Sequence, residues 1–389
     1  MIKKHVNDIV INDIYALVGN ACEQYDMEFK TTLDIKTESQ KKEFLADVSS
    51  FANASGGDLI YGIVESGGKA VGIPGMPVLD ADQVTLSAEN LIRAGIDERI
   101  AFDLRHYELG PGCFVFLIRV YEGPAKPHQV CLAGTGKYYA RGNAGKYQLD
   151  HAQIKTAIEA TSQSKNQIKQ FIDDRFNQIG QGPLPVPLHP NGLVALILIP
   201  SRTFDAHPSF DLDSQENKLL SPMNGGGHTP SYNGMGMLST SGYDRPTRDA
   251  YLQIRKNGIL ETVNSTICCV FQGQKILPAS DSHNYEKVLV GCIINYLSHY
   301  DKLGVAFPVY CRVGLLNCQD HWLAWTGMRN PFQTDRSLGS DLILSDELVI
   351  HSAKADTPQL LKPFFDTVWQ HAGRARSYNF DENGQWKPR

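Results

Sequence analysis

The 389-residue sequence predicts an α+β protein, in which a mixed sheet with helices is followed by a second α+β domain. Three observations point to this class. A segment with helical spacing, 37–57, precedes a nearly continuous apolar run, 58–65, as expected for a helix followed by a central strand. A turn at 110–112 separates two strand-like segments. The stretch 180–192 is rich in proline and marks the start of a second series of strand and helix patterns.

The first of these helices has a start signal and a stop signal. Thr37 followed by Gln40 forms a capping-box pattern, which satisfies backbone N–H groups at a helix N-terminus. Gly56 and Gly57 end the helix, and we interpret Asn53 as a support for that turn. The remaining elements expected in the first 150 residues are a short helix at 5–19, a strand within 22–34, a hairpin partner at 70–73, a helix at 80–96, strands at 99–109 and 113–123, and a last sheet segment at 136–146.

The chain is expected to contain two domains joined by an arm. Residues 1–150 form the first domain, 151–191 form a helical arm with a Pro-rich linker, and 192–389 form a C-terminal α+β domain of unknown role. The segments expected in the last part are a buried strand at 193–200, a Gly- and Ser-rich loop region at 214–247, paired strands at 250–277, a helix at 284–300, strands through 350 and a helix at 357–372.

Composition excludes several classes of protein. Apolar residues make up 42% of the sequence, enough for a substantial core, and no segment approaches the roughly 18 consecutive apolar residues of a membrane span. The first residues lack the apolar run of a signal peptide, so we expect a cytoplasmic protein. The net charge of −5 argues against indiscriminate coating of nucleic acid but leaves room for a local basic groove.

The stretch CEQYDMEFKTTLD, 22–34, raises the question of function. On a strand, Glu28 and Lys30 lie on one face while Met27 and Phe29 lie on the other. One interpretation is a solvated edge strand with an ion pair of little energetic value. The other is a metal and phosphate site, in which carboxylates bind a hard divalent cation and Lys30 stabilises charge that develops on a cleaved phosphate.

Three motifs together resemble the Schlafen-type AlbA-like domain family. They are EQYDMEFK, FANASGGDLIYGIVE and KYYARGN, and they occur in the order and at the separations usual for that family, over residues 22–150. The resemblance implies a Schlafen/AlbA-like mixed sheet and binding of nucleic acid. Some Schlafen proteins are endoribonucleases that use three acidic residues and a divalent metal, Mg²⁺ or Mn²⁺. The positions that match this trio are Glu23, Glu28 and Glu65, with Glu65 standing where the family more often has Asp.

Five residues are candidates for contact with nucleic acid: Lys30, Lys137, Tyr139, Arg141 and Lys146. Aromatic rings stack on bases and cations pair with phosphate. Aromatic residues on strands are also frequently half-buried packing residues, which is the alternative interpretation of Tyr138 and Tyr139.

We therefore expect a metal-dependent endoribonuclease that acts on structured RNA such as transfer RNA, with Glu23, Glu28, Glu65 and Lys30 in the catalytic site and a role in defence or stress response. The alternative is a non-catalytic transcriptional regulator that binds nucleic acid and senses a ligand through its C-terminal domain. Schlafen nucleases carry two such lobes and this sequence shows one, so a homodimer is expected.

Overall fold

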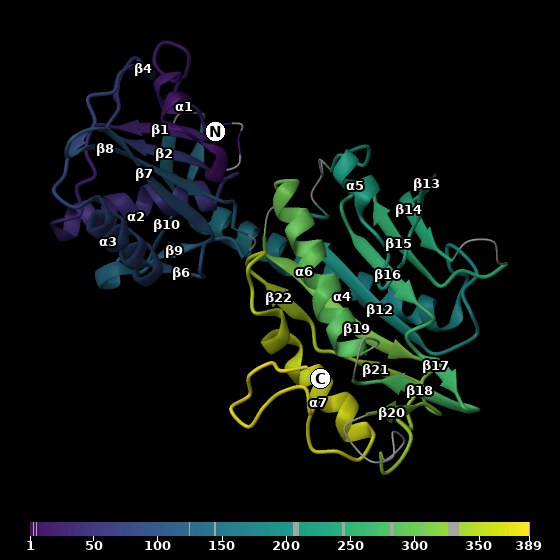
Figure 1. Cartoon of the computed structure of the whole chain (residues 1–389). Coiled ribbons are helices and arrows are strands. Elements are labelled where there is room, and N and C mark those ends of the chain that lie inside the picture. Colours follow the sequence, from purple (N-terminus) through teal and green to yellow (C-terminus); the bar gives the residue numbers. More distant parts are fainter. Residues whose placement is uncertain are drawn as a thin grey trace. The chain divides into compact units, whose positions relative to one another are not determined.

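The computed structural model describes residues 1–388 apart from 3, 5, 124, 144, 205–209, 243–245, 281–283, 306 and 326–333. The chain divides into two compact units, 1–164 and 165–389, and each is described by itself (Figure 1). Helices and strands are mixed in both units, which confirms the α+β class. No helix in the described part of the chain has the length and apolar character that crossing a bilayer requires.

The elements of the first unit differ little from those expected, except that the helix expected at 5–19 is broken into two short turns. The helices are η1 (Val6–Asp8), α1 (Ile11–Tyr15), α2 (Glu38–Ala52), α3 (Ala81–Gly95), η2 (Leu132–Gly134) and the start of α4 (His151–Gln181). The strands are β1 (Met27–Lys30), β2 (Gly57–Tyr61), β3 (Val64–Ser66), β4 (Lys69–Gly72), β5 (Met76–Pro77), β6 (Ile96–Asp97), β7 (Phe102–Gly110), β8 (Cys113–Val120), β9 (Gln129–Val130), β10 (Lys137–Gly142) and β11 (Gly145–Gln148).

Two sheets and a hairpin make up this unit. The main sheet has the order β1-β2-β8-β5, with β7 on the other edge of β8. Its β1–β2 pair is parallel and its other pairs are antiparallel. The second sheet has the order β11-β10-β9-β6, and β3 pairs with β4 in a separate hairpin. Strand β2 is therefore central, as expected, whereas β1 lies at an edge.

Both faces of the main sheet are covered. Helices α2 and α3 pack on one face through a core that includes Phe44, Phe51 and Leu59 (Figure 1). The N-terminal turns cover the other face, where Met27 and Phe29 of β1 are buried. The alternation predicted for β1 is thus observed, and it directs Glu28 and Lys30 toward the side of α2.

The end of α2 is built as the glycines and Asn53 suggest. The Asn53 side chain donates to the carbonyls of His128 and Tyr139 and accepts from the His128 N–H, which ties the helix to β9 and β10. Gly56 has φ +73°, and a Cβ there would lie 2.7 Å from the Val120 carbonyl oxygen. A Cβ on Gly57 would lie 2.4 Å from the Phe51 ring. These residues therefore permit close packing of backbone and ring at the helix end.

In its described residues the second unit contains the rest of α4 and the helices α5 (Gln215–Leu219), α6 (Tyr285–Lys302) and α7 (Thr357–His371). Its strands are β12 (Leu193–Pro200), β13 (Thr229–Asn233), β14 (Gly236–Ser241), β15 (Ala250–Arg255), β16 (Leu260–Asn264), β17 (Cys269–Phe271), β18 (Gln274–Pro278), β19 (Val309–Leu316), β20 (Trp322–Ala324), β21 (Leu342–Leu344) and β22 (Leu348–Ile350).

A large sheet between helices organises this unit. Within the described residues its order is β13-β14-β15-β16-β12-β19-β21, with β22 also paired to β19, and β17, β18 and β20 form a smaller sheet. Alternate residues of β12 enter different cores: Val194 and Leu196 face α6 and α7, while Ala195 and Ile197 face α4. Helix α6 lies across the first of these faces (Figure 1). Burial on both faces explains why β12 is apolar at every position.

One expectation for this unit is wrong. Residues 214–247 were expected to be loop, but the described part of that segment contains α5 and the β13–β14 hairpin. The side chain of Asn233 accepts from the backbone N–H groups of Met235 and Gly236, which shapes the turn. Strand β13 is exposed along most of its length, so its sequence lacks the apolar alternation that predicts strands. Residues 243–245 of the segment lie outside the described residues.

Candidate nucleic-acid interface

Glu28 and Lys30 meet on an edge strand of the first unit. Within the described residues β1 pairs in the sheet with β2 alone, and on its other edge the Phe29 N–H donates to Glu23 Oε1. The Lys30 Nζ lies 2.7 Å from Glu28 Oε1. The ion pair that the sequence suggests therefore forms, and it is partly buried rather than fully solvated, since the Glu28 side chain is 13% exposed.

Both oxygens of Glu28 are held by cations. Its Oε1 pairs with Lys30, and its Oε2 accepts a hydrogen bond from Arg141 Nη1. Burial alone would raise the pKa of Glu28, but the hydrogen bonds and charges of Lys30 and Arg141 outweigh it and hold that pKa below its usual value. Glu28 is consequently a carboxylate with two counter-charges.

Asp47 of α2 binds two lysines from different elements. Its Oδ1 accepts from Lys146 Nζ at 2.7 Å, and its Oδ2 lies 3.5 Å from Lys30 Nζ. The Asp47 side chain is 4% exposed. Burial and the charge of Glu28 raise the pKa of Asp47, although both lysines oppose that shift. Lys146 Nζ also donates to Glu43 Oε1 at 2.6 Å. Glu43 lies one helical turn before Asp47 on α2.

Arg141 is the most enclosed cation of the site. Its guanidinium carbon lies 4.3 Å from the centre of the Phe51 ring, and its side chain is 5% exposed. The Arg141 Nε is buried without a hydrogen-bond partner among the described residues. Stacking on Phe51 together with the pairing to Glu28 places this side chain inside the unit, so a phosphate could reach it only after rearrangement.

These contacts define a charge-paired cluster in which three cations balance three anions. Its members are Glu28, Lys30, Glu43, Asp47, Arg141 and Lys146. Four of them, Glu28, Lys30, Arg141 and Lys146, are separate candidates in the sequence. Glu43 and Asp47 were missed, although their spacing of four residues on a helix with a buried apolar face marks them as neighbours on one side of α2.

The other two predicted acids, Glu23 and Glu65, meet at the β3–β4 turn. Glu65 Oε2 accepts from the Gly68 N–H at 2.7 Å, and the Glu23 N–H donates to the Gly68 carbonyl at 2.6 Å. Glu23 Oε1 accepts from the Phe29 N–H at 2.9 Å. Burial raises the pKa of Glu23, and the negative charges of Glu28 and Glu65 raise it further. The charges of Glu28 and Glu65 therefore each act on Glu23.

The arrangement does not fit a preassembled three-carboxylate metal site. In the part of the chain that the structure describes, no three His, Cys, Asp or Glu side chains are grouped so as to hold a metal ion. Both Glu28 oxygens are engaged by Lys30 and Arg141. Binding of Mg²⁺ or Mn²⁺ by Glu23, Glu28 and Glu65 stays a prediction.

Lys137, Tyr139 and Arg141 occupy alternate positions of β10 and so share one face of that strand. Lys137 is exposed and has no ion-pair partner within the described residues. The Tyr139 ring is half-buried against the core of the unit, and Lys146 Nζ lies 5.9 Å from its centre. This face of β10 therefore carries, in order, an exposed lysine, a half-buried aromatic ring and the arginine of the charge-paired cluster. We call these three residues the β10 row.

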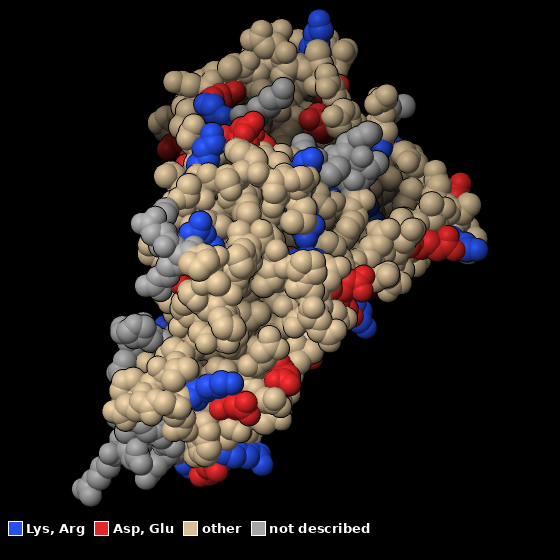
Figure 2. Space-filling model, turned by 90° about the vertical axis from the view of Figure 1, so that its right-hand side faces the viewer, with Lys and Arg blue, Asp and Glu red and all other residues tan. Residues whose placement is uncertain are grey.

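The chain has no strong excess of positive charge on the face drawn in Figure 2. There, lysines and arginines lie beside aspartates and glutamates in small groups rather than in one broad basic surface. This agrees with the net charge of −5. Recognition of an anionic partner would therefore depend on local groups such as the β10 row.

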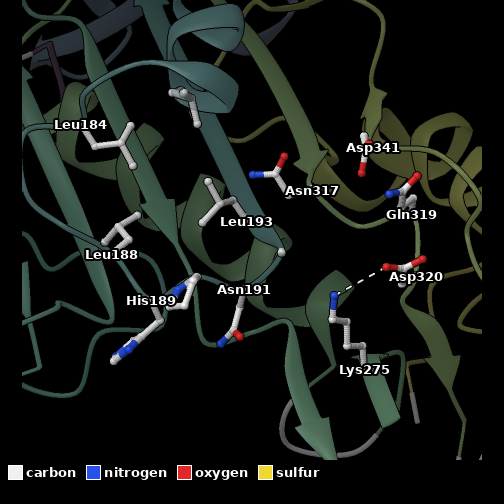
Figure 3. Close-up of a pocket in the computed structure, with 13 residues that line it drawn as sticks. Leu184, Leu188, His189, Asn191, Leu193, Lys275, Asn317, Gln319, Asp320 and Asp341 are labelled. Atoms are coloured by element: carbon white, nitrogen blue, oxygen red, sulfur yellow. Dashed lines mark ion pairs between the residues drawn. The ribbon is translucent and has the colours of Figure 1, made fainter.

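The second unit has its own concave site, with a volume of about 460 Å³ (Figure 3). Leu184 and Leu188 form one side, and Asn317 and Asp341 lie on the other. An ion pair of 3.6 Å joins Lys275 and Asp320 at its margin. The expected ligand-sensing role of this unit stays a prediction.

Most of the first unit is similar to a known protein family. Residues 23–150 match the family model described as Schlafen, AlbA_2. The match confirms the resemblance, which covers the N-terminal third of the chain. It contains β1, α2 and the β10–β11 hairpin, and hence the whole charge-paired cluster. The Schlafen/AlbA_2 match supports a nucleic-acid-binding family.

Two solved structures are similar over part of the chain. The DIP2311 protein from Corynebacterium diphtheriae is 19% identical, with a TM-score of 0.27, and the match covers 39% of this chain and 28% of that one. The N-terminal domain of a RecG-related protein from Nitrosomonas europaea is 22% identical, with a TM-score of 0.25. That match covers 33% of this chain and 87% of the solved domain. This chain thus spans less than a third of the DIP2311 protein. No curated protein matches the sequence.

Proposed function

We propose that the first unit binds nucleic acid, with RNA as the favoured partner, along the face of β10 that carries Lys137 and Tyr139. The observation that carries the proposal is the row of a free lysine, an aromatic ring and the charge-paired cluster, inside the region that matches the Schlafen/AlbA_2 model. Alternating cations and rings suit a single strand, because phosphates pair with the cations while bases stack on the rings.

The cations of this face differ in how readily they reach a phosphate. Lys137 is exposed, the Lys30 side chain is 35% exposed, and the Arg141 side chain is 5% exposed. We therefore assign phosphate contact to Lys137 first and Lys30 second. Arg141 acts as a positioning residue, since it holds Glu28 and stacks on Phe51.

Binding is tested by fluorescence anisotropy with labelled single-stranded RNA and the full chain over a range of salt concentrations. Lys137→Gln should weaken binding and lower the salt slope by about one. The matched control is Lys155→Gln, an exposed lysine of α4 whose nearest acid is 3.8 Å away. Equal effects of the two substitutions, or no affinity for RNA in the unmodified chain, would contradict the proposal.

A second candidate function is the metal-dependent endoribonuclease. The observation that favours it is that Glu28 and Glu65 lie close enough to Glu23 for their negative charges to raise the pKa of Glu23. A divalent cation relieves such repulsion and would supply a Lewis acid for phosphodiester cleavage. Glu23 and Glu65 would hold the ion more directly than Glu28. In the described chain a backbone N–H engages only one carboxylate oxygen of each, whereas both oxygens of Glu28 are paired with cations.

Cleavage is tested by incubating the full chain with total RNA and Mn²⁺ or EDTA and mapping the new ends. Glu65→Gln should abolish Mn²⁺-dependent ends, because it removes a ligand charge while an amide oxygen can still accept from Gly68. Glu89→Gln, at a half-buried glutamate of α3 that lies 3.9 Å from Arg93, is the control. Identical end patterns with Mn²⁺ and with EDTA would leave binding as the function of the first unit.

A further inference from the structure

A pocket opens beside the charge-paired cluster, between the end of β1 and the first turns of α2. Its volume is about 340 Å³, which lies in the range of roughly 300–1,000 Å³ typical of small-ligand pockets. We call it the Tyr61 pocket. Its lining includes Lys30, Asp34, Glu43, Phe44, Asp47 and Tyr61.

The floor of the Tyr61 pocket is apolar and fixed. Phe44 and Tyr61 are each 3% exposed, and their ring centres lie 6.3 Å apart at an interplanar angle of 43°. Leu33, which is 8% exposed, completes this floor. Packed rings under a concave opening suit a flat, partly apolar ligand.

The Tyr61 hydroxyl is available to such a ligand. The side chain is almost fully buried and lines the pocket, yet its hydroxyl has no hydrogen-bond partner among the described residues. Its oxygen is not among the enclosed polar atoms that lack a partner in the described chain, so the hydroxyl opens into the pocket and can donate to a ligand there. Burial and the charges of Asp47, Glu28 and Glu43 raise the pKa of Tyr61, which keeps the hydroxyl protonated and able to donate.

The charges around the pocket disfavour a phosphate as its main occupant. Lys30 is the one cation among the described residues that line it. Of the three acids in the lining, Glu43 and Asp47 are paired with Lys146, whereas Asp34 has no ion-pair partner within the described residues. Asp34 Oδ2 accepts from the Thr32 hydroxyl at 2.7 Å, and its other oxygen has no partner in the described chain. The unpaired carboxylate of Asp34 disfavours an anion and attracts neutral groups that donate hydrogen bonds.

A nucleobase meets these requirements, and guanine meets them best. Its Watson–Crick edge places two adjacent N–H donors beside a carbonyl acceptor. A carboxylate such as Asp34 accepts from the pair of donors, while the ammonium of Lys30 donates to the carbonyl. Adenine, cytosine and uracil lack the adjacent donors, so each would leave one of these groups unpaired.

We infer that the Tyr61 pocket holds one unstacked base of a bound RNA strand and that guanine is the base it favours. The inference rests on the proposed binding of RNA by the first unit. Proteins that read single-stranded RNA commonly hold splayed bases by their Watson–Crick edges above aromatic side chains. The pocket shares Lys30 with the charge-paired cluster, so a strand that contacts the cluster would pass its opening.

The test compares oligouridine carrying one central guanine, inosine, adenine or cytosine, measured by fluorescence anisotropy with the full chain. We expect the guanine strand to bind about tenfold more tightly than the others. Inosine lacks the exocyclic amino group and should lose most of that preference. Asp34→Asn and Tyr61→Phe should each reduce the guanine preference at least threefold, whereas Asp82→Asn, whose side chain is 95% exposed, should not change it.

The outcomes separate this inference from the proposed function. Equal affinity for all four strands, or a guanine preference that both variants retain, would overturn the pocket assignment while the binding of RNA stood. Absence of affinity for every strand would overturn the proposed function itself. Stronger competition by arginine amide than by guanosine would assign the pocket to a protein partner and so overturn the inference.

Discussion

Arg141 and Lys146 lie directly opposite each other on the antiparallel β10–β11 ladder. Like charges in such positions destabilise a hairpin unless acids separate them. Glu28 binds Arg141, and Asp47 binds Lys146. The acids of β1 and α2 thus neutralise two cations that face each other across neighbouring strands. The stability of the hairpin therefore depends on the ion pairs of the cluster.

Lys146→Gln should destabilise the protein by about 1–3 kcal/mol, because the fold favours the charge of Lys146 and the buried carboxylate of Asp47 loses its closer counter-charge. Urea unfolding followed by circular dichroism measures the change. Glu43→Gln is the control, since the Glu43 side chain is 65% exposed, and it should change stability by no more than about 0.5 kcal/mol. Equal effects would show that the pairing of Lys146 with Asp47 contributes nothing.

Glu28→Gln should cost more, about 3–5 kcal/mol, because it leaves the enclosed guanidinium of Arg141 without a counter-charge. Loss of activity in this variant would then reflect stability as much as chemistry. The unfolding free energy of Glu65→Gln, an exposed position, should stay within about 0.5 kcal/mol of the unmodified chain. A fully stable Glu28→Gln variant would contradict the structural role of the cluster.

The second unit should lose stability as pH rises from 5 to 8, because burial raises the pKa of Glu286 to about 7. The folded state then holds a proton that the unfolded state releases near pH 4.5, so the contribution is present at low pH and is lost as pH passes 7. The expected loss is about 3 kcal/mol. The indole of Trp369 donates to Glu286 at 2.6 Å, so tryptophan fluorescence reports the transition.

Glu286→Gln should flatten this pH dependence, measured as the difference in unfolding free energy from the unmodified chain at each pH. Glu382→Gln, an exposed glutamate of the same C-terminal region, should leave the dependence unchanged. A pH profile of Glu286→Gln that runs parallel to that of the unmodified chain would show that Glu286 does not carry the effect.

A fragment of residues 1–164 should fold alone, whereas 1–180 should be less soluble. The reason is that Ile168, Ile172 and Phe176 of α4 pack in the core of the second unit and would be exposed in the longer fragment. Size-exclusion chromatography and circular dichroism of both fragments check this. A well-folded 1–180 beside an unfolded 1–164 would move the boundary toward the Pro-rich stretch.

The homodimer expected from the single Schlafen-type lobe stays a prediction. Light scattering at micromolar concentration should give twice the mass of one chain. A monomer mass, with RNA binding unchanged at the same concentration, would mean that one first unit suffices for binding.

The sequence alone determined the local elements with strong patterns. Thr37 and Gln40 form the expected capping box, and the strands on either side of the turn at 110–112 pair as β7 and β8. These elements depend on neighbours in the chain, so their signals are local. The exposed strand β13 was missed because packing imposes no apolar alternation on it.

The tertiary structure alone decided which charges meet. Glu28, Asp47 and Arg141 come from a strand, a helix and a second sheet, and no spacing in the sequence brings them together. It also decided that Arg141 is enclosed by Phe51 while Lys137 stays exposed, a difference that two positions on the same face of β10 do not reveal. Burial and long-range pairing set the charge state of each group, so the chemistry of the site follows from the fold and not from residue type.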